Sequence, residues 1–183
     1  MVRSAALLVR ERGARATSIE DVLAHCGAPR GSVYHHFPGG RKQLLREATD
    51  YAGEFVASRI ERATDALEML DALVSDYREQ LVRSDFRAGC PVVAVAIEAG
   101  DPESDLYEHA DAAFVCWQEL LEKQLEAEGV KASRAIELAV LVIASIEGAI
   151  VMARARRDAE PLDQVHRQLR DLLDAEIDQD RPG

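Results

Sequence analysis

Cysteine is scarce in this sequence, and the few cysteines present are not arranged for pairing. Cys26, Cys90 and Cys116 are odd in number and far apart along the chain, which argues against a disulfide framework and against a zinc site of the CxxC type. We therefore expect reduced, buried thiols. A redox sensor at Cys116 is disfavoured, because a reactive thiol needs nearby positive charge and the neighbouring charges are Asp111 and Glu119.

Long apolar runs are also missing. In the C-terminal half the longest uncharged stretch, 138–146, is far shorter than the roughly 20 residues that span a bilayer, and Glu137 and Glu147 flank it. Arginines are interleaved with the apolar residues of 1–15, whereas a signal peptide carries its positive charge first. These features predict a buried helix around 138–146 and a protein of the cytoplasm.

Motifs typical of catalysis or metal binding are absent too. The sequence has no glycine-rich phosphate loop and no nucleophile beside a base at a recognisable spacing. His35 and His36 are adjacent, and neighbouring helical residues point about 100° apart, whereas metal ligands on a helix use i, i+4 spacing. A small helical enzyme that uses Glu98 or Glu147 as an acid or base is therefore disfavoured. We expect no enzymatic activity, no cofactor and no metal.

Positive charge is in deficit overall but concentrated at one end. The net charge is −11, yet residues 1–50 hold eight Lys and Arg against five Asp and Glu, a net +3, which leaves −14 for the remainder. A basic segment suits DNA phosphates, and an acidic remainder keeps the rest of the surface off DNA. A nucleic-acid partner is therefore expected at the N-terminal end.

Apolar residues recur at helical spacing along nearly the whole chain, and no stretch alternates as an exposed strand does. The 183 residues, 48% of them hydrophobic, suffice for a real core. We predict an all-α protein of about nine helices, separated by turn signals such as that at 100–102. The predicted helices cover 2–12, 17 or 18 to 26, 29–36, 41–64, 66–83, 90–98, 104–128, 132–157 and 161–177.

The second and third predicted helices are short and are joined by a tight turn at 27–29. Thr17 and Ser18 each have an acid three residues later, as in a capping box. Two such helices after a supporting helix form a helix-turn-helix, whose last helix enters the major groove of DNA. Val33 and Phe37 are expected to pack inward, being four residues apart. The donors and the aromatic side chain that the last helix displays are Arg30, Ser32, Tyr34, His35 and His36.

Residues 17–22 and 26–37 strongly resemble the N-terminal signature of the TetR family of regulators. They read Thr-Ser-Ile-Glu-Asp-Val and Cys-Gly-Ala-Pro-Arg-Gly-Ser-Val-Tyr-His-His-Phe, and the resemblance extends over about residues 2–48. The runs 31–40 and 88–98 resemble the LmrA/YxaF-like subgroup of that family. One departure concerns the residue after the two glycines, where the family usually has Lys and this chain has Arg41 followed by Lys42.

The resemblance implies a helix-turn-helix DNA-binding domain at 1–48 and a helical ligand-binding and dimerisation domain at 49–183. It implies that the third helix touches operator DNA, with Thr17 or Ser18 and Lys42 holding phosphates at the edges. Arg30 suits either a guanine edge or a phosphate, and both roles stay open. The residues assigned to DNA binding are Thr17, Ser18, Arg30, Gly31, Ser32, Tyr34, His35, Arg41 and Lys42.

In the second domain the resemblance implies an apolar cavity for an effector, to which a fully packed core is the alternative. Trp117, Phe114 and Tyr77 offer flat surfaces for an aromatic compound. Glu98 and Glu147 interrupt apolar runs, so each is either exposed or semi-buried and available to a polar ligand group. The residues assigned to effector binding are Leu70, Leu73, Tyr77, Val93, Ile97, Phe114, Trp117, Leu121, Ile143 and Glu147.

The resemblance further implies a homodimer through the helices at about 132–157 and 161–177, paired in a four-helix interface. The positions expected to supply it are Leu138, Leu141, Val142, Ser145, Ala149, Leu169, Leu172 and Leu173. The sequence thus predicts a ligand-responsive repressor that binds a palindromic operator as a homodimer and is released by a small apolar or aromatic effector. The alternative is a helical adaptor or small-molecule-binding protein without DNA binding.

Overall fold

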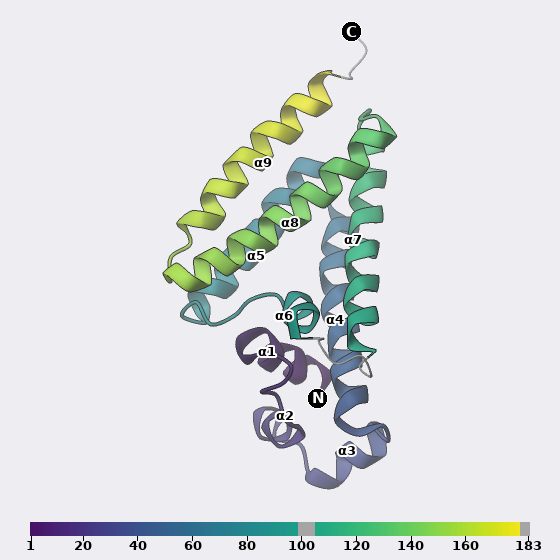
Figure 1. Cartoon of the computed structure of the whole chain (residues 1–183), viewed down its shortest axis with the longest axis vertical. Helices are drawn as coiled ribbons and strands as arrows, with labels where there is room; N and C mark the ends of the chain where they lie inside the picture. Colours follow the sequence, from purple (N-terminus) through teal and green to yellow (C-terminus); the bar gives the residue numbers. More distant parts are fainter. Residues whose placement is uncertain (99–104, 180–183) are drawn as a thin grey trace. The chain divides into compact units, whose positions relative to one another are not determined.

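The structure is a computed structural model, and it describes residues 1–98 and 105–179. Within these residues it has nine α-helices and no strand (Figure 1). The predicted all-α fold of about nine helices is therefore confirmed. The helices are α1 (Val2–Arg12), α2 (Ile19–Cys26), α3 (Arg30–His36), α4 (Gly40–Arg62), α5 (Ala66–Arg83), α6 (Pro91–Glu98), α7 (Leu106–Ala127), α8 (Ala132–Arg156) and α9 (Glu160–Gln179).

The predicted helix ends agree closely with the observed ones where the two can be compared. Pro29 precedes α3 as its N-cap, instead of being its first helical residue. The helix α4 begins at Gly40, whose backbone has a positive φ of 64°, a conformation that costs glycine no steric penalty. The predicted turn at 100–102 and the predicted helix start at 104 lie outside the described residues.

Packing divides the chain into two compact units. The first comprises Met1–Phe55 and Arg87–Ala113, and the second comprises Val56–Phe86 and Phe114–Gly183. The first unit includes α6, which packs against α1, so it is not the N-terminal segment alone. The division predicted at 1–48 and 49–183 separates DNA binding from ligand binding and dimerisation, not packing units, and it stays a prediction.

The core of the first unit fixes α3 from one side only. Val33 and Phe37, which were predicted to face inward, are 1% and 5% exposed. They pack with apolar side chains of α1, α2 and α4, and the buried cluster consists of Ala5, Ala6, Leu8, Val22, Leu23, Val33, Phe37, Leu44 and Ala48. The remaining face of α3 is left for polar side chains.

The helices α4 and α7 approach each other closely within the first unit. A Cβ atom placed on Gly53 of α4 would lie 2.9 Å from the Cβ of Ala113 on α7, which is closer than ordinary packing allows. Beside this contact, the Nδ1 atom of His109 lies 2.6 Å from Oδ1 of Asp50. Glycine at position 53 is therefore a packing requirement of this pair of helices.

The second unit is built around α5, α8 and α9. Figure 1 shows α9 running alongside α8, with which it packs extensively. An ion pair joins the two helices, with Nη2 of Arg134 lying 2.6 Å from Oε1 of Glu176. Their hydrogen bond raises the pKa of Arg134 and lowers that of Glu176. The pair therefore stays charged over the whole physiological range.

The face of α8 and α9 that was predicted to form a dimer is largely the inner face of this unit. Of those positions, only Leu141 is exposed, at 45%, and Ser145 and Leu172 are half-buried. The prediction was wrong for five residues, because periodicity shows that a helix side is apolar but not whether it packs inside the subunit or against a second copy. The residues buried inside the subunit are Leu138, Val142, Ala149, Leu169 and Leu173.

Among the described residues, α8 is also the one helix long and apolar enough, by length and composition, to cross a membrane. Only 39% of its most apolar window is buried inside the protein. A single helix of this kind is weak evidence for a membrane span, since the core helix of a soluble protein passes the same test. What the observation does establish is that much of the apolar surface of α8 remains uncovered.

The three cysteines differ in their surroundings. Cys90 is buried, as predicted, but Cys26 and Cys116 are exposed, so the expectation of buried thiols was wrong for these two. Cys26 is the last residue of α2. Cys116 directly precedes the buried Trp117, and because neighbouring residues of a helix point about 100° apart, its side chain can face outward while that of Trp117 faces inward. In the described ranges no three His, Cys, Asp or Glu side chains are grouped as metal ligands.

Candidate nucleic-acid interface

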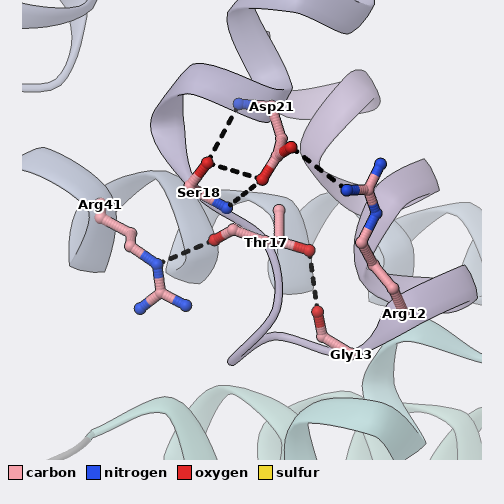
Figure 2. A network of polar contacts seen from close by, with 6 residues as sticks. All are labelled: Arg12, Gly13, Thr17, Ser18, Asp21 and Arg41. Carbon is pink, nitrogen blue, oxygen red and sulfur yellow. Dashed lines mark hydrogen bonds and ion pairs between the residues drawn. The ribbon is translucent and has the colours of Figure 1, made fainter.

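The helix-turn-helix begins at a complete capping box. The Oγ atom of Ser18 accepts a hydrogen bond from the backbone N–H of Asp21 at 3.1 Å, and the Asp21 carboxylate accepts one from the backbone N–H of Ser18 at 3.0 Å (Figure 2). Arg12 of α1 pairs with the same carboxylate at 3.2 Å. The hydrogen bonds from the Ser18 side chain and backbone lower the pKa of Asp21. The start of α2 is thus fixed by Ser18, one of the two predicted caps.

The turn between α2 and α3 follows the predicted chemistry. Gly27 ends α2 in the left-handed conformation, with φ of 70°, and its N–H donates to the carbonyl of Leu23 at 2.9 Å. Pro29, with φ of −65°, then leads into α3. These two residues set the direction in which α3 leaves α2.

The outer face of α3 carries polar groups that the core does not use. Tyr34 is 80% exposed, and Arg30, Gly31 and His35 are exposed as well. The hydroxyl of Ser32 donates to the carbonyl of Pro29 at 2.6 Å, so its oxygen remains able to accept a further hydrogen bond. A short helix that buries one side and presents a cation, a phenol and an imidazole on the other is suited to binding a charged, hydrogen-bonding surface.

The α1–α2 loop, residues 13–17, is held by Arg41 and Thr17. Nε of Arg41 donates to the carbonyl of Thr17 at 2.8 Å, and its Nη2 donates to the carbonyl of Ala14 (Figure 2 shows the first of these). The Thr17 side chain is buried, and its hydroxyl donates to the carbonyl of Gly13 at 2.8 Å. A planar guanidinium reaches two carbonyls at once, which a lysine ammonium on a flexible stem does less well.

Lys42, the last residue assigned to DNA binding, lies at the start of α4. Its ammonium is 3.5 Å from Asp105, whose carboxylate also lies 3.0 Å from Nη1 of Arg46. Lys42 remains about half-exposed, at 47%. Two cations of α4 therefore share one carboxylate from the residue that precedes α7.

Glu98, Arg15 and Gly13 meet next to this region, and none of the three is among the residues predicted to bind DNA or effector. Glu98, at the end of α6, accepts a hydrogen bond at 2.6 Å from the backbone N–H of Arg15, beside Gly13. The only sequence signal was that Glu98 interrupts an apolar run, which was interpreted as exposure or as a contact to a polar ligand group. Its contact residue is 83 positions away in the chain.

The residues assigned to effector binding fall in both compact units. Val93 and Ile97 of α6 belong to the first unit, where Ile97 is 74% exposed, and the others belong to the second. There, the rings of Phe114 and Trp117 meet edge to face with centroids 5.3 Å apart. Leu70, Leu73, Tyr77, Trp117 and Leu121 are buried, and Phe114, Ile143 and Glu147 are half-buried. That these residues line a cavity stays a prediction.

Comparisons with known proteins match both parts of the chain. Residues 2–48 match the family model for bacterial regulatory proteins of the tetR family, and residues 66–168 match that for the C-terminal domain of LmrA/YxaF-like transcriptional regulators. The latter range contains α6, although α6 packs against α1 of the N-terminal part.

Similar proteins, which match this chain over nearly their full length, are also transcriptional regulators. An uncharacterized HTH-type transcriptional regulator of Mycobacterium tuberculosis is 58% identical over 97% of this chain and 94% of its own. The HTH-type transcriptional regulator LmrA of Bacillus subtilis is 30% identical over 94% of each chain. The crystal structure of a TetR regulatory protein from Rhodobacter sphaeroides shares the fold, with a TM-score of 0.80 over 92% of this chain and 94% of its own at 21% identity. The chain therefore belongs to the TetR family of transcriptional regulators, with a DNA-binding helix-turn-helix and an LmrA/YxaF-like C-terminal domain.

Proposed function

We propose that this regulator is a repressor that binds a palindromic operator as a homodimer and is released by a small apolar or aromatic effector. The observation that carries the proposal is the outer face of α3, where Tyr34 is 80% exposed beside the exposed Arg30 and His35. The inner face of the same helix is fixed by Val33 and Phe37. Binding in the major groove requires a helix that is held by the core on one side and exposes hydrogen-bond donors on the other.

Within that interface, Arg30 and Tyr34 are the residues we expect to matter most. Arg30 donates either to a guanine edge or to a phosphate, and the Tyr34 hydroxyl suits a phosphate oxygen. Lys42 is expected to neutralise a phosphate at the edge of the interface, and Gly31, Ser32 and His35 are expected to form its centre.

The side chains of Thr17, Ser18 and Arg41 already hold the α1–α2 loop and the start of α2. Their part in DNA binding is therefore expected to be chiefly that of setting the loop, with contacts to phosphate at its edge. These side chains bind backbone carbonyls of the loop and the backbone N–H of Asp21, and these contacts fix where α2 begins and, through α2, where α3 begins.

The dimer is expected to form through the face of α8 that the subunit leaves uncovered. Five large apolar side chains of this helix are between 45% and 50% exposed. The first two lie about one helical turn apart, and the last two lie about three turns beyond the middle ones, so all five fall on one side of α8. A Cβ placed on Gly148, which lies among them, would have nothing within 4 Å in the subunit, so a second helix has room to approach. A second copy of the chain supplies the matching apolar surface under two-fold symmetry. The five side chains are Ile136, Val140, Leu141, Val151 and Met152.

The effector is expected to be apolar or aromatic, since the assigned residues of the second unit are aliphatic and aromatic with Glu147 as the polar exception. To act, it must bind the form of the dimer that does not fit DNA more tightly than the form that does. Half-site centres lie about 34 Å apart, one turn of DNA, so a small change in the separation of the two α3 helices weakens binding. The place of action is the cytoplasm, where the DNA of a bacterium lies.

The test is binding of the full-length protein to the DNA upstream of its own gene, measured by fluorescence anisotropy at several salt concentrations. We expect affinity to fall at least about 100-fold between about 50 and 200 mM salt. Arg30→Ala and Tyr34→Ala should each weaken binding about 10-fold or more. Arg62→Ala, which removes an exposed cation at the far end of α4, is the matched control and should leave affinity near that of the parent.

Absence of binding by a folded protein, both to this DNA and in a selection from random duplexes, would contradict the proposal. The alternative of a helical adaptor or small-molecule-binding protein without DNA binding would then take its place. Equal affinity of the parent and both α3 variants for every DNA tested would count against α3 as the reading helix.

A further inference from the structure

The end of α6 is hydrogen-bonded to the α1–α2 loop in two places. The carboxylate Oε2 of Glu98 accepts the backbone N–H of Arg15 at 2.6 Å, and the backbone carbonyl of Glu98 accepts Nη2 of Arg15 at 3.2 Å. A hydrogen bond from a backbone N–H to an ionised carboxylate belongs to the stronger class of protein hydrogen bonds. The loop therefore has a defined partner on α6.

Gly13 makes this contact sterically possible. Its backbone, with φ of 88° and ψ of 165°, lies in a region that is essentially restricted to glycine. A Cβ on Gly13 would lie 1.9 Å from Oε1 of Glu98, well inside van der Waals contact. The loop therefore has no side chain at the position where the Glu98 carboxylate lies.

The segment that leads into α6 is tied to α1 as well. The backbone N–H of Gly89 donates to the carbonyl of Arg10, near the end of α1, at 2.8 Å. Both ends of the segment 89–98 therefore hydrogen-bond to main-chain groups at or just after the end of α1.

The same loop leads directly into the helix-turn-helix and is held in place by hydrogen bonds from Arg41. Arg41 donates to the carbonyls of Thr17 and Ala14, and the loop ends at Ser18, the cap of α2. A displacement of the loop at Arg15 therefore reaches Ser18, the N-cap of α2, within three residues. Through the fixed turn at Gly27 and Pro29, α3 follows α2.

We propose that Glu98 is the positioning residue through which α6 holds the α1–α2 loop, and with it the helix-turn-helix, in the arrangement that binds DNA. The helix α6 lies within the range that matches the C-terminal domain of the family, 66–168, so this contact is a route from that domain to the DNA-binding helices. The inference rests on the proposed function for its readout in DNA binding. It assigns Glu98 to the loop instead of to a ligand in the effector region.

The test uses the full-length protein with Glu98→Ala and Glu98→Gln, and Glu54→Ala as the matched control. Glu54 is an exposed glutamate of α4 in the same compact unit. The first readout is amide hydrogen exchange at Arg15 measured by NMR, which reports the hydrogen bond itself. We expect exchange at Arg15 to become at least about 10-fold faster in Glu98→Ala. Glu98→Gln retains an acceptor oxygen and should restore a large part of the protection.

The second readout is affinity for the DNA upstream of the gene. Glu98→Ala should bind about 3- to 10-fold more weakly, with Glu98→Gln between it and the parent, and Glu54→Ala like the parent. Faster exchange at Arg15 without any loss of DNA affinity would overturn the inference, because the contact would then be structural only. Unchanged amide exchange at Arg15 in Glu98→Ala would also overturn the inference, because the hydrogen bond between Arg15 and Glu98 would then not protect this amide.

A third measurement uses Gly13→Ala, alone and combined with Glu98→Ala. The added methyl group meets the Glu98 carboxylate, so part of its effect should disappear when that carboxylate is removed. We expect the fall in melting temperature of the double variant to be smaller than the sum of the two single falls. Strict additivity would contradict the contact. Because exchange and melting need no DNA, failure of the parent to bind DNA would be recognised separately, as a failure of the proposed function.

Discussion

The two compact units present opposite kinds of surface. In the first, α3 exposes Arg30, Tyr34 and His35 over a buried face that fixes the helix. In the second, α8 exposes apolar side chains such as Leu141 and Val151, at 45% and 49%. Charge contacts weaken with salt, whereas apolar burial does not. The comparison teaches that one chain has two uncovered surfaces of different chemistry, and that salt and substitution should separate their roles.

The largest expected effect comes from placing a charge on the apolar surface. Under two-fold symmetry Leu141→Glu enters a dimer interface twice, and each buried carboxylate costs about 2 kcal/mol or more. The dimer dissociation constant should therefore rise at least about 100-fold. Sedimentation equilibrium measures it directly, and operator affinity should fall with the dimer.

Val82→Glu is the matched control for this change. Val82 is 55% exposed on α5 in the same compact unit, so the substitution adds the same charge to a different exposed apolar position. Its dimer dissociation constant should equal that of the parent. A Leu141→Glu protein that dimerises like Val82→Glu would show that α8 is not the interface.

The next effect concerns packing inside the first unit, where contact depends on shape alone. Gly53→Ala places a Cβ 2.9 Å from that of Ala113, and overpacking of this kind costs about 1–3 kcal/mol. We expect a fall of several degrees in the melting temperature, measured by calorimetry, with little dependence on salt.

Ala113→Gly in the Gly53→Ala background provides the control. It removes the opposing methyl group, so the double variant should lose less stability than the sum of the two single variants, even though glycine itself disfavours a helix by about 1 kcal/mol. If the two losses simply add, the helices α4 and α7 do not pack as closely here as the structure indicates.

A smaller effect is expected at the cap that begins α2. Ser18→Ala removes the side-chain acceptor for the Asp21 N–H and should cost about 1 kcal/mol. Ser133→Ala, at an exposed serine of α8, is the control and should change stability little. Urea unfolding monitored by circular dichroism measures both, and equal losses would contradict the role of the cap.

The same cap predicts how stability depends on pH. Hydrogen bonds from Ser18 lower the pKa of Asp21 in the folded protein. The stabilisation by Asp21 is therefore present above its unfolded pKa and is lost as pH falls through the lower folded value. Asp21→Asn should flatten this acidic part of the stability curve. A curve with the same slope in parent and variant would contradict the assignment.

Much of the fold was predictable because its determinants are local. The cap at Ser18, the turn at Gly27 and the inward pair Val33 and Phe37 each depend on residues at most four positions apart, and all are found in the structure. The DNA-binding and effector residues depend on a partner, and they stay predictions. The family resemblance, and not composition, supplied them.

What failed, or was missed, depends on pairings between distant parts of the chain. Three of the five dimer positions predicted on α8 lie on its packed side, because Leu138 and Leu141 are equally apolar and only packing against α5 and α9 distinguishes them. Glu98 was recognised as unusual, but its contact with Arg15 spans 83 positions and has no local signal. Such contacts follow from the assembled fold and not from periodicity.

The smallest expected effect tests charge on the DNA-binding side directly. Asp105 lies 3.5 Å from Lys42 and 3.0 Å from Arg46, so its carboxylate occupies cations that a phosphate would use. Exposed ion pairs are worth at most about 1 kcal/mol. Asp105→Asn should therefore raise DNA affinity about 2- to 5-fold at low salt, measured by fluorescence anisotropy.

The salt dependence decides how this effect is read. Asp111→Asn, at an exposed aspartate of α7, removes the same charge without a contact to Lys42 and serves as the control. The gain in Asp105→Asn should exceed that in Asp111→Asn at low salt and vanish as salt screens the charges, while the dimer dissociation constant stays constant throughout. Equal gains in the two variants would mean that net charge, and not competition for Lys42 and Arg46, sets the affinity, and the first unit would then attract DNA only by its overall field.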